Sequence, residues 1–315
     1  MQVFQDIFSV EIADMCVQTI GGFDGLHRGH QYLLEQVREA AAQRGAKSMV
    51  ITFSNHPSAI LHPDRPVKLL TTLDEKVSIL EGLGIDYAVV IDFTPELSRM
   101  SAKAFMKEIL IDKLKGSALL VGYDHRFGHQ SSETFSDYQR YGKHLGMEVI
   151  LAGELPQEES ATHVCSSAIR KAIAEGDMAL AADLLGRHYS IEGTVTHGEG
   201  IGRTIGFPTA NIAIKNPCKL LPKKGAYMVR VIIDETPHTG MLYIGNRPTL
   251  DNLAREQRVE VYILDYNEDI YGQDVRIEFV DFLRGEQQFS SIEDLQEQLK
   301  VDLFQIRERS KRVRQ

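Results

Sequence analysis

The stretch that decides the fold of the first half of the chain runs from Thr19 to His30 and reads TIGGFDGLHRGH. An apolar run over 16–20, expected to be a strand, precedes it, and a helical pattern over 31–44 follows it. A helix that starts after such a turn offers unpaired N–H groups and the positive end of its dipole, and both attract phosphate. Glycines in the turn allow positive φ angles and a close approach of the backbone. The stretch therefore predicts a strand, a turn that binds polyphosphate, and a helix.

Short apolar runs and helical patterns keep alternating from this turn to about residue 185. Further strands are expected over 48–53, 87–91, 119–121 and 147–151, and helices over 74–82, 102–114 and 133–145. Strands that alternate with helices are typical of a parallel sheet with helices on both faces. We therefore expect a doubly wound α/β domain over residues 1–186, with its ligands at the carboxyl ends of the strands.

The pattern changes after residue 186. Strands are expected over 189–195, 225–233, 240–244, 258–264 and 274–281, separated by Gly, Pro, Asn and Asp, and one helix over 292–308. Several short strands followed by a single helix indicate a small antiparallel β-barrel with a C-terminal helix. We place this second domain at 187–315 and find no internal repeat.

Two histidines, His27 and His30, lie three residues apart where the turn meets the helix. Their imidazoles are able to donate hydrogen bonds to the charge that develops when the α–β phosphoanhydride bond of a nucleotide breaks. The pair could instead be a surface feature or two ligands of a metal site. A metal site needs further Cys, His or carboxylate partners, and none is obvious nearby. Inside a glycine-rich turn before a helix, phosphate handling is the better interpretation.

Three other segments carry polar residues where the α/β domain would bind a ligand. Residues 166–170 read SSAIR and combine two hydroxyls and helix-start amides with an arginine, which suits a second phosphate clamp. On its own this segment would be a helix cap beside a surface arginine. Residues 121–128 and 52–57 each follow an expected strand. Their polar and aromatic side chains suit a nucleotide and an aromatic acceptor better than an ordinary loop.

The expected barrel opens with a glycine-rich segment, 196–211, that reads THGEGIGRTIGFPTAN. The segment lacks the Gly-Lys-Ser/Thr of a P-loop. It is able to fold over phosphates, although a glycine-rich loop alone is more often a hairpin. Thr209 and Asn211 offer a hydroxyl and an amide oxygen, which are hard ligands suited to a magnesium ion that bridges phosphates.

Glu260 is a carboxylate in an otherwise apolar alternating strand, where acidic side chains are uncommon. A carboxylate beside a magnesium-bound γ-phosphate is able to accept the proton of an attacking hydroxyl group. The alternative is an outward-facing glutamate on a half-buried strand, and the strand by itself does not decide between the two.

The first half of the chain resembles the nucleotidyltransferase superfamily, which includes adenylyltransferases and cytidylyltransferases. His27, Gly29 and His30 match the histidine signature of that family in spacing, and residues 166–170 match its second signature, with Ser167 where many relatives carry Thr. The resemblance implies that the histidines bind the triphosphate and stabilise the transition state without a covalent enzyme intermediate. It implies ATP contacts for the following residues: Gly21, Gly22, Phe23, Asp24, His27, Gly29, His30, Ser166, Ser167 and Arg170.

The second half of the chain resembles the flavokinases. Residues 202–211, GRTIGFPTAN, closely match the Gly-Arg-x-x-Gly-Phe-Pro-Thr-Ala-Asn motif of that family, and shorter matches follow in order from Leu221 to Phe289. With the first half included, the resemblance to prokaryotic bifunctional riboflavin kinase/FAD synthetases covers nearly the whole chain. It implies that the barrel phosphorylates riboflavin to FMN. It also implies that the α/β domain adenylylates FMN to FAD with release of pyrophosphate, and that both reactions use ATP and Mg²⁺.

The same resemblance implies roles for individual residues. Gly202, Arg203, Thr209 and Asn211 would bind ATP, Thr209 and Asn211 would hold the Mg²⁺, and Glu260 would be the base for the ribityl 5′-hydroxyl. Flavin contacts are expected at Asn55, Tyr123, Asp124, Phe127, Arg284 and Glu286. One departure is Tyr243, which stands where relatives usually have Asn and could alter the packing near the flavin.

Composition sets the remaining expectations. The formal net charge of −9 argues against extended nucleic-acid binding, and no apolar run approaches the roughly 20 residues of a membrane span. The first residues lack the features of a signal peptide, and three widely spaced cysteines fit a reduced cytosolic protein. The expected partners are small molecules, namely riboflavin, FMN and ATP, with no nucleic acid and no membrane, while the oligomeric state stays open.

Two other functions remain open from the residues alone. A nucleotidyltransferase for a different acceptor would leave the barrel passive, and Thr209, Asn211 and Glu260 argue against that. A flavin sensor or a small RNA-binding barrel would bind without turnover. RNA binding requires basic strands with exposed aromatic side chains, and the barrel sequence does not have that bias.

Overall fold

The computed structural model describes residues 1–5, 7, 10–64, 67–122, 127–128, 133–156, 162–197, 202, 205–246 and 257–313. The chain forms two compact units, residues 1–166 and 167–315. The division falls inside helix α7 (Ser166–Glu175), earlier than the boundary expected at 186–188. The next helix, α8 (Met178–Leu185), packs against β7 (Tyr189–Thr196) and β12 (Asp274–Gly285), which belong to the second unit.

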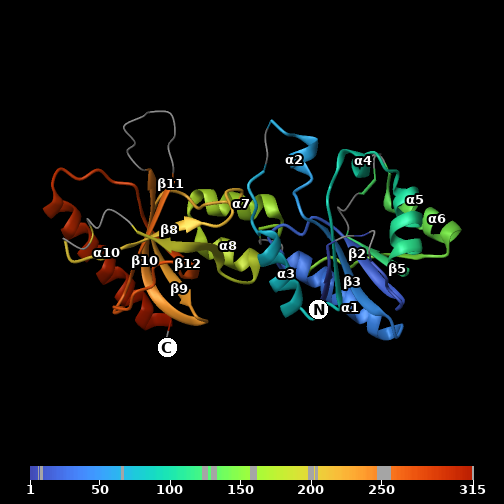
Figure 1. Ribbon diagram of the computed structural model, residues 1–315, viewed down its shortest axis with the longest axis horizontal. Helices are drawn as coiled ribbons and strands as arrows, with labels where there is room; N and C mark the ends of the chain where they lie inside the picture. Colours follow the sequence, from blue (N-terminus) through green and yellow to red (C-terminus); the bar gives the residue numbers. More distant parts are fainter. Residues whose placement is uncertain are drawn as a thin grey trace. The chain divides into compact units, whose positions relative to one another are not determined.

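The first unit is built on a six-stranded sheet in which all strands are parallel (Figure 1). In spatial order the strands are β1 (Gln2–Phe4), β4 (Tyr87–Ile91), β3 (Lys47–Phe53), β2 (Cys16–Ile20), β5 (Gly116–Val121) and β6 (Glu148–Leu151). From β2 the chain winds outward to β3 and β4 on one side, and later to β5 and β6 on the other. The predicted doubly wound α/β architecture is confirmed. The turn that begins at Gly21 lies at the switch between these directions, where such sheets bind ligands.

Helices cover both faces of this sheet. Successive side chains of a strand point to opposite faces, so one strand packs against helices on both sides. On β3, Val50 packs into a cluster with Leu34 of α1 (Arg28–Gln43) and Leu80 of α3 (Leu73–Gly82). Its neighbours Met49 and Ile51 pack into the opposite cluster, with residues of three elements: α5 (Ala102–Phe105), the π-helix η1 (Met106–Lys113) and α6 (Phe135–Leu145). The helix expected over 102–114 therefore exists but changes from α to π geometry at Met106. Two short helices, α2 (Ser58–Leu61) and α4 (Pro95–Ser98), follow β3 and β4.

The second unit contains a closed antiparallel barrel in the order β10-β11-β8-β7-β12-β9 (Figure 1). The remaining strands are β8 (Ala210–Ile214), β9 (Gly225–Ile233), β10 (Thr236–Asn246) and β11 (Gln257–Ile263). On β11, Val259, Val261 and Ile263 are at most 5% exposed, while the alternating residues are half-buried. Arg258 and Glu260 therefore lie on the other face of the strand from the barrel core. The predicted antiparallel barrel is confirmed.

The C-terminal helix of the second unit, α10 (Ile292–Val313), covers part of the barrel. Its apolar residues Leu295, Leu299, Leu303 and Ile306 join Met228 of β9 and Met241 of β10 in one cluster. This packing closes the side of the barrel that would otherwise expose apolar surface. None of the helices in the described part of the chain is long and apolar enough to cross a membrane.

Candidate active sites

The turn after β2 has an unusual backbone. Phe23, Gly25 and Leu26 all have positive φ angles, of 47°, 88° and 41°. For the two residues with side chains this conformation costs about 1–2 kcal/mol each. It is retained because both side chains are buried, with Phe23 3% and Leu26 0% exposed. Burial of these apolar anchors therefore holds the polar backbone of the turn in one shape.

Asp24 fastens this turn to the segment that precedes α3. Its carboxylate accepts hydrogen bonds from the N–H groups of Leu70 at 2.9 Å and Thr71 at 3.0 Å. The Thr71 hydroxyl in turn accepts from the N–H of Gly25 at 3.0 Å. The ATP contact expected for Asp24 stays a prediction. The described bonds give its carboxylate a second role, which is to hold the turn in place.

The two histidines are stacked at the start of α1. His27 is the N-cap of the helix, and its Nδ1 accepts the N–H of His30 at 3.3 Å. The ring centroids of His27 and His30 lie 3.6 Å apart with an interplanar angle of 17°, and those of Phe23 and His30 lie 5.2 Å apart in a T-shaped arrangement. A Cβ on Gly29 would lie 3.3 Å from the His27 ring, so glycine leaves room for this stacking. The spacing of the histidines therefore sets two imidazoles together at a positive helix end.

Ser166 connects the second predicted phosphate segment to the same turn. Its hydroxyl donates to the carbonyl of Asp24 at 2.8 Å, across 142 residues of sequence. Ser166 begins α7, so Ser167 and Arg170 follow in the first turns of that helix. The structure thus joins Ser166 to the turn as the sequence suggested, while ATP contacts of all three residues stay predictions.

In the first unit, two of the residues expected to contact flavin bind other protein residues in the structure. The side-chain amide of Asn55 exchanges hydrogen bonds with the backbone of Phe93, at 2.9 and 3.1 Å. Phe127 is 9% exposed and stacks on Tyr138, with ring centroids 4.4 Å apart. Both residues hold loops at the carboxyl edge of the sheet, and their contact with flavin stays a prediction. Tyr123 and Asp124 lie outside the described residues.

Lys76 is a residue of this region that our sequence analysis missed. It is 6% exposed, and its Nζ donates to the carbonyl of Gly22 at 2.8 Å and to the hydroxyl of Thr52 at 3.0 Å. Burial lowers the pKa of Lys76 to about 8, while the negative charge of Asp24 acts in the opposite direction. The signal was available: Lys76 lies four residues before the fully buried Leu80, on a helical face where lysine is unusual.

In the second unit, the predicted base lies in a cluster of polar side chains. Glu260 of β11 pairs in register with Asn211 of β8 and with Tyr243 of β10. Arg258, also missed from sequence, forms an ion pair with Glu260 through Nη2. Its Nε donates to the amide oxygen of Asn211 at 3.3 Å. One guanidinium therefore joins the expected base to an expected metal ligand.

The glycine-rich segment before β8 packs closely on itself. The N–H of Phe207 donates to the carbonyl of Gly202 at 2.8 Å. A Cβ on Gly202 would lie 2.2 Å from the carbonyl oxygen of Phe207 and 3.0 Å from the Thr209 hydroxyl. Glycine is therefore required at residue 202 for the chain to approach Thr209. Arg203 lies outside the described residues.

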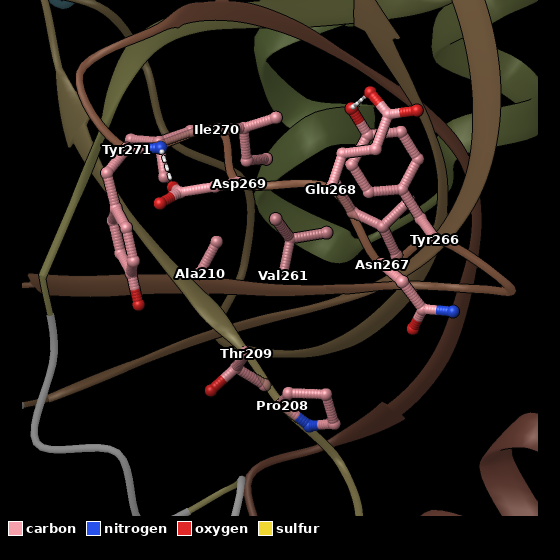
Figure 2. Close-up of a pocket in the computed structure, with 12 residues that line it drawn as sticks. Pro208, Thr209, Ala210, Val261, Tyr266, Asn267, Glu268, Asp269, Ile270 and Tyr271 are labelled. Atoms are coloured by element: carbon pink, nitrogen blue, oxygen red, sulfur yellow. Dashed lines mark hydrogen bonds between the residues drawn. The ribbon is translucent and has the colours of Figure 1, made fainter.

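A cavity of about 380 Å³ opens beside Thr209. Figure 2 shows Thr209 and Pro208 on one side of it and the turn over 266–271 on the other. Ala210 and Val261 line it between them, and Tyr266 and Tyr271 stand on opposite sides of Val261 (Figure 2). A mixture of apolar floor, aromatic rings and polar rim is typical of sites for small organic ligands.

Arg284, expected to contact flavin, is bound to the terminal helix. Its guanidinium donates to the Asp302 carboxylate from Nε at 2.9 Å and from Nη2 at 2.8 Å, and Asp302 is 1% exposed. The neighbouring Glu286 accepts a hydrogen bond from the Tyr243 hydroxyl at 3.2 Å. Burial, followed by the charge of Glu286, raises the pKa of Tyr243 to about 12. Flavin contacts of Arg284 and Glu286 stay predictions, and Asp302 is a third residue that the sequence analysis missed.

The fold and the sites define a class of protein. A doubly wound domain with two histidines at a helix start after a glycine-rich turn, followed by a barrel with a carboxylate beside an arginine and an amide, fits an ATP-dependent transferase with two domains. Comparison with known families agrees. Residues 9–168 match the FAD synthetase family and residues 185–310 match the riboflavin kinase family. The chain belongs to the family of bifunctional riboflavin kinase/FMN adenylyltransferases.

Individual relatives support this assignment along the whole chain. The bifunctional riboflavin kinase/FMN adenylyltransferase of Escherichia coli K12 is 36% identical over 294 residues, which cover 93% of this chain and 92% of the relative. The protein of the same description from Listeria monocytogenes is 37% identical, with 91% and 90% covered. A crystal structure from Streptococcus pneumoniae, described as a macrolide-efflux protein, has a TM-score of 0.87 at 31% identity and covers 97% of this chain. The two domains and their order are therefore common to these proteins.

Proposed function

We propose that the barrel transfers the γ-phosphate of ATP to riboflavin and that the α/β domain transfers AMP from a second ATP to the resulting FMN. The products are FMN, then FAD with pyrophosphate. The observation that carries the proposal is that each unit has its own polar site. The first has two stacked imidazoles at a helix N-terminus, and the second has a carboxylate that pairs in register with Asn211 and forms an ion pair with Arg258.

In the barrel, Glu260 is proposed to accept the proton of the ribityl 5′-hydroxyl as that oxygen attacks the γ-phosphorus. The bond from the γ-phosphorus to the β-phosphate oxygen breaks, and ADP leaves. Because Glu260 is bound to Arg258, the hydroxyl must share or replace that guanidinium as a partner. Arg258 then remains beside the transferring phosphoryl group, where its charge offsets the negative charge that builds up.

A divalent metal ion is generally used by enzymes with these two activities, and we propose that it is Mg²⁺ here. Thr209 and Asn211 would hold it in the barrel through a hydroxyl and an amide oxygen, both hard donors. Among the described residues, no group of three or more His, Cys, Asp and Glu is placed to hold a metal. This donor set fits an ion that takes its remaining ligands from phosphates and water. When bound, the ion would neutralise charge on the phosphates.

In the α/β domain, a phosphate oxygen of FMN is proposed to attack the α-phosphorus of ATP, and pyrophosphate leaves. No protein side chain is needed as a nucleophile. His27 and His30, with the N–H groups at the start of α1, would stabilise the charge on the leaving pyrophosphate. Ser166, Ser167 and Arg170 would bind the phosphates from α7.

The cavity beside Thr209 is proposed to take the nucleoside of the ATP used by the barrel. Gly202, Arg203, Thr209 and Asn211 would contact its phosphates. We propose that the flavin ring of riboflavin lies near Arg284 and Glu286, and that of FMN near Asn55, Tyr123, Asp124 and Phe127.

The experiment is a time course with the purified protein, riboflavin, ATP and Mg²⁺, in which the flavins are separated and quantified. FMN that appears first and FAD that follows are expected, and a chelator should stop both. FMN without FAD would mean that the α/β domain uses another acceptor. If neither product forms, the proposal is wrong. FMN supplied directly then tests the second step independently of the first.

A further inference from the structure

A buried ammonium group stands behind the phosphate-binding turn. Lys76 lies in α3, and its Nζ has three acceptors: the Gly22 carbonyl at 2.8 Å, the Thr52 hydroxyl at 3.0 Å and the Phe53 carbonyl at 3.3 Å. An ammonium group has three protons, so these acceptors use all of them. Burying a charge is costly unless it is fully hydrogen-bonded, and here it is. The Lys76 ammonium is therefore buried with all of its hydrogen bonds made, as expected for a group with a structural role.

Two opposite charges fasten α3 to the turn. From the turn, the Asp24 carboxylate binds the N–H groups of Leu70 and Thr71, just before α3. From α3, the Lys76 ammonium binds the carbonyl of Gly22. Helix α3 and the residues just before it therefore bind the turn on both sides of residue 23.

The bond to the Gly22 carbonyl fixes the direction of a peptide plane. In a trans peptide the C=O and the N–H point in opposite directions. Because Lys76 holds the Gly22 carbonyl toward the protein interior, the N–H of Phe23 points away from Lys76. A Cβ on Gly22 would meet no atom within 4 Å outside the adjacent residues, so the backbone is uncovered at Gly22. Lys76 therefore fixes the direction of the Phe23 N–H from the opposite side of the same peptide.

The other acceptors of Lys76 belong to the end of β3. Thr52 and Phe53 are its last two residues, and Asn55, proposed to contact FMN, follows. Asn55 and Lys76 line one small hollow together with Gly22 and His56. One ammonium therefore joins the turn proposed for ATP to the strand end that leads to the proposed acceptor site.

We propose that Lys76 is a positioning residue for FMN adenylylation, which holds the Gly22 carbonyl so that the N–H groups of the turn face the triphosphate. The inference rests on the proposed function of this turn. In this proposal Lys76 acts through the turn and not by contact with either substrate. Its removal should lower kcat/KM for ATP in adenylylation and leave the riboflavin kinase reaction unchanged, because the kinase site lies in the other unit.

The charge of Lys76 gives a second readout. Its pKa of about 8 means that the ammonium is lost as the pH rises past that value. The groups that face it are Asp24 from the turn, Glu75 on α3, whose carboxylate caps its own helix, and His56 across the hollow. Between about pH 7 and 9.5, kcat/KM for ATP, which reports the free enzyme, should fall in adenylylation only.

The test compares Lys76→Met, Lys76→Arg and the control Lys47→Met in the full chain. Lys47 is the first residue of β3, the strand whose last two residues bind Lys76, and it forms an exposed ion pair with Asp86 at 3.1 Å. With FMN and ATP supplied, Lys76→Met should lose about 10- to 100-fold in kcat/KM for ATP, because small misplacements of binding groups have effects of this size. Lys47→Met should match the wild type. Lys76→Arg stays charged and should show no decline between about pH 7 and 9.5.

Each outcome decides the matter. A folded Lys76→Met protein with kcat/KM within about twofold of wild type overturns the inference, as does the same alkaline decline in Lys76→Arg. If Lys76→Met does not fold, the wild-type profile decides: a decline near pH 8 in adenylylation but not in kinase activity supports the role, and a flat profile rejects it. Wild-type protein that makes no FAD from FMN would instead mean that the proposed function is wrong.

Discussion

The two sites use their charged side chains in different ways. In the α/β domain, the charged side chains Asp24 and Lys76 bind backbone groups and hold the turn in place. In the barrel, Asn211, Arg258 and Glu260 share an outer strand face and contact one another. The first site therefore depends on the shape of a backbone segment, and the second depends on side-chain chemistry.

This difference predicts how each site responds to substitution. A change in the turn alters where N–H groups point, and the loss is spread over binding and catalysis. A change in the barrel cluster removes a chemical group, and the loss falls on one step. Since both activities are present in one chain, each domain is the control for the other.

The largest effect is expected for Glu260→Gln. The amide keeps the shape of the side chain but cannot accept the proton of the 5′-hydroxyl, so kinase kcat should fall by about 10²–10⁴-fold. Adenylylation of added FMN should not change. Glu278→Gln, which removes a carboxylate from β12 beside Arg276, is the matched control and should keep both activities. Full kinase activity in Glu260→Gln would show that the barrel does not use this base.

The next effect concerns stability of the barrel alone. Asp302→Ala removes the 1%-exposed partner of Arg284 and leaves a largely buried guanidinium without its counter-charge. Breaking such a pair costs about 3–5 kcal/mol, so the barrel should unfold at lower denaturant concentration and lose kinase activity there. Adenylylation should persist to the wild-type midpoint. Glu297→Gln, an exposed change on the same helix, is the control, and equal midpoints for both variants would reject a stabilising role for Asp302.

The architecture was accessible from sequence where periodicity was strong. The parallel alternation over 16–151 and the strand-rich second half predicted the sheet and the barrel. Local geometry was less accessible: η1 differs from an α-helix by its hydrogen-bonding pattern, which apolar spacing does not report. Strands β1 and β8 were not predicted from the sequence. Both are short and half-buried, so they lack the alternation of buried and exposed residues that marks a strand.

Site residues divide in the same way. His27 and His30 were found because they are close in sequence, inside one motif. Lys76 and Arg258 were missed because their partners are distant: Arg258 meets Asn211 across 47 residues, and the main acceptors of Lys76 include backbone carbonyls. Backbone acceptors leave no sequence signature. A charged residue on an apolar helical face, as for Lys76 and for Asp302 among Leu295, Leu299 and Ile306, was the one signal available.

A third prediction separates the two roles of His27. Asn keeps a cap for the N–H of His30, so His27→Asn should retain the stability of α1, while His27→Ala should cost about 1 kcal/mol in unfolding free energy. Both should lose about 10²–10³-fold in adenylylation kcat, since alanine has no donor and the shorter asparagine, while its oxygen caps the helix, does not carry its amide to the position of the imidazole Nε2. The exposed His144→Asn is the control. Wild-type adenylylation in His27→Asn would mean that His27 acts only as a cap, and the backbone alone would then make the site.

The smallest effect is expected for Tyr243→Phe, which tests a single side-chain hydrogen bond of the barrel. The change removes only the hydroxyl that binds Glu286, whereas the ring still packs over Gly245, whose Cβ position lies 2.4 Å from it. A single hydrogen bond of this kind is worth about 0.5–1.5 kcal/mol, so KM for riboflavin should rise by about tenfold or less, equally at every assay pH because the phenol stays protonated to about pH 12. Tyr141→Phe removes a similar bond, to Glu133 at 2.9 Å, in the other domain and should leave the kinase unchanged. A rise of more than about tenfold would mean that the hydroxyl of Tyr243 binds the flavin directly. The side-chain site of the barrel would then extend from β11 onto β10.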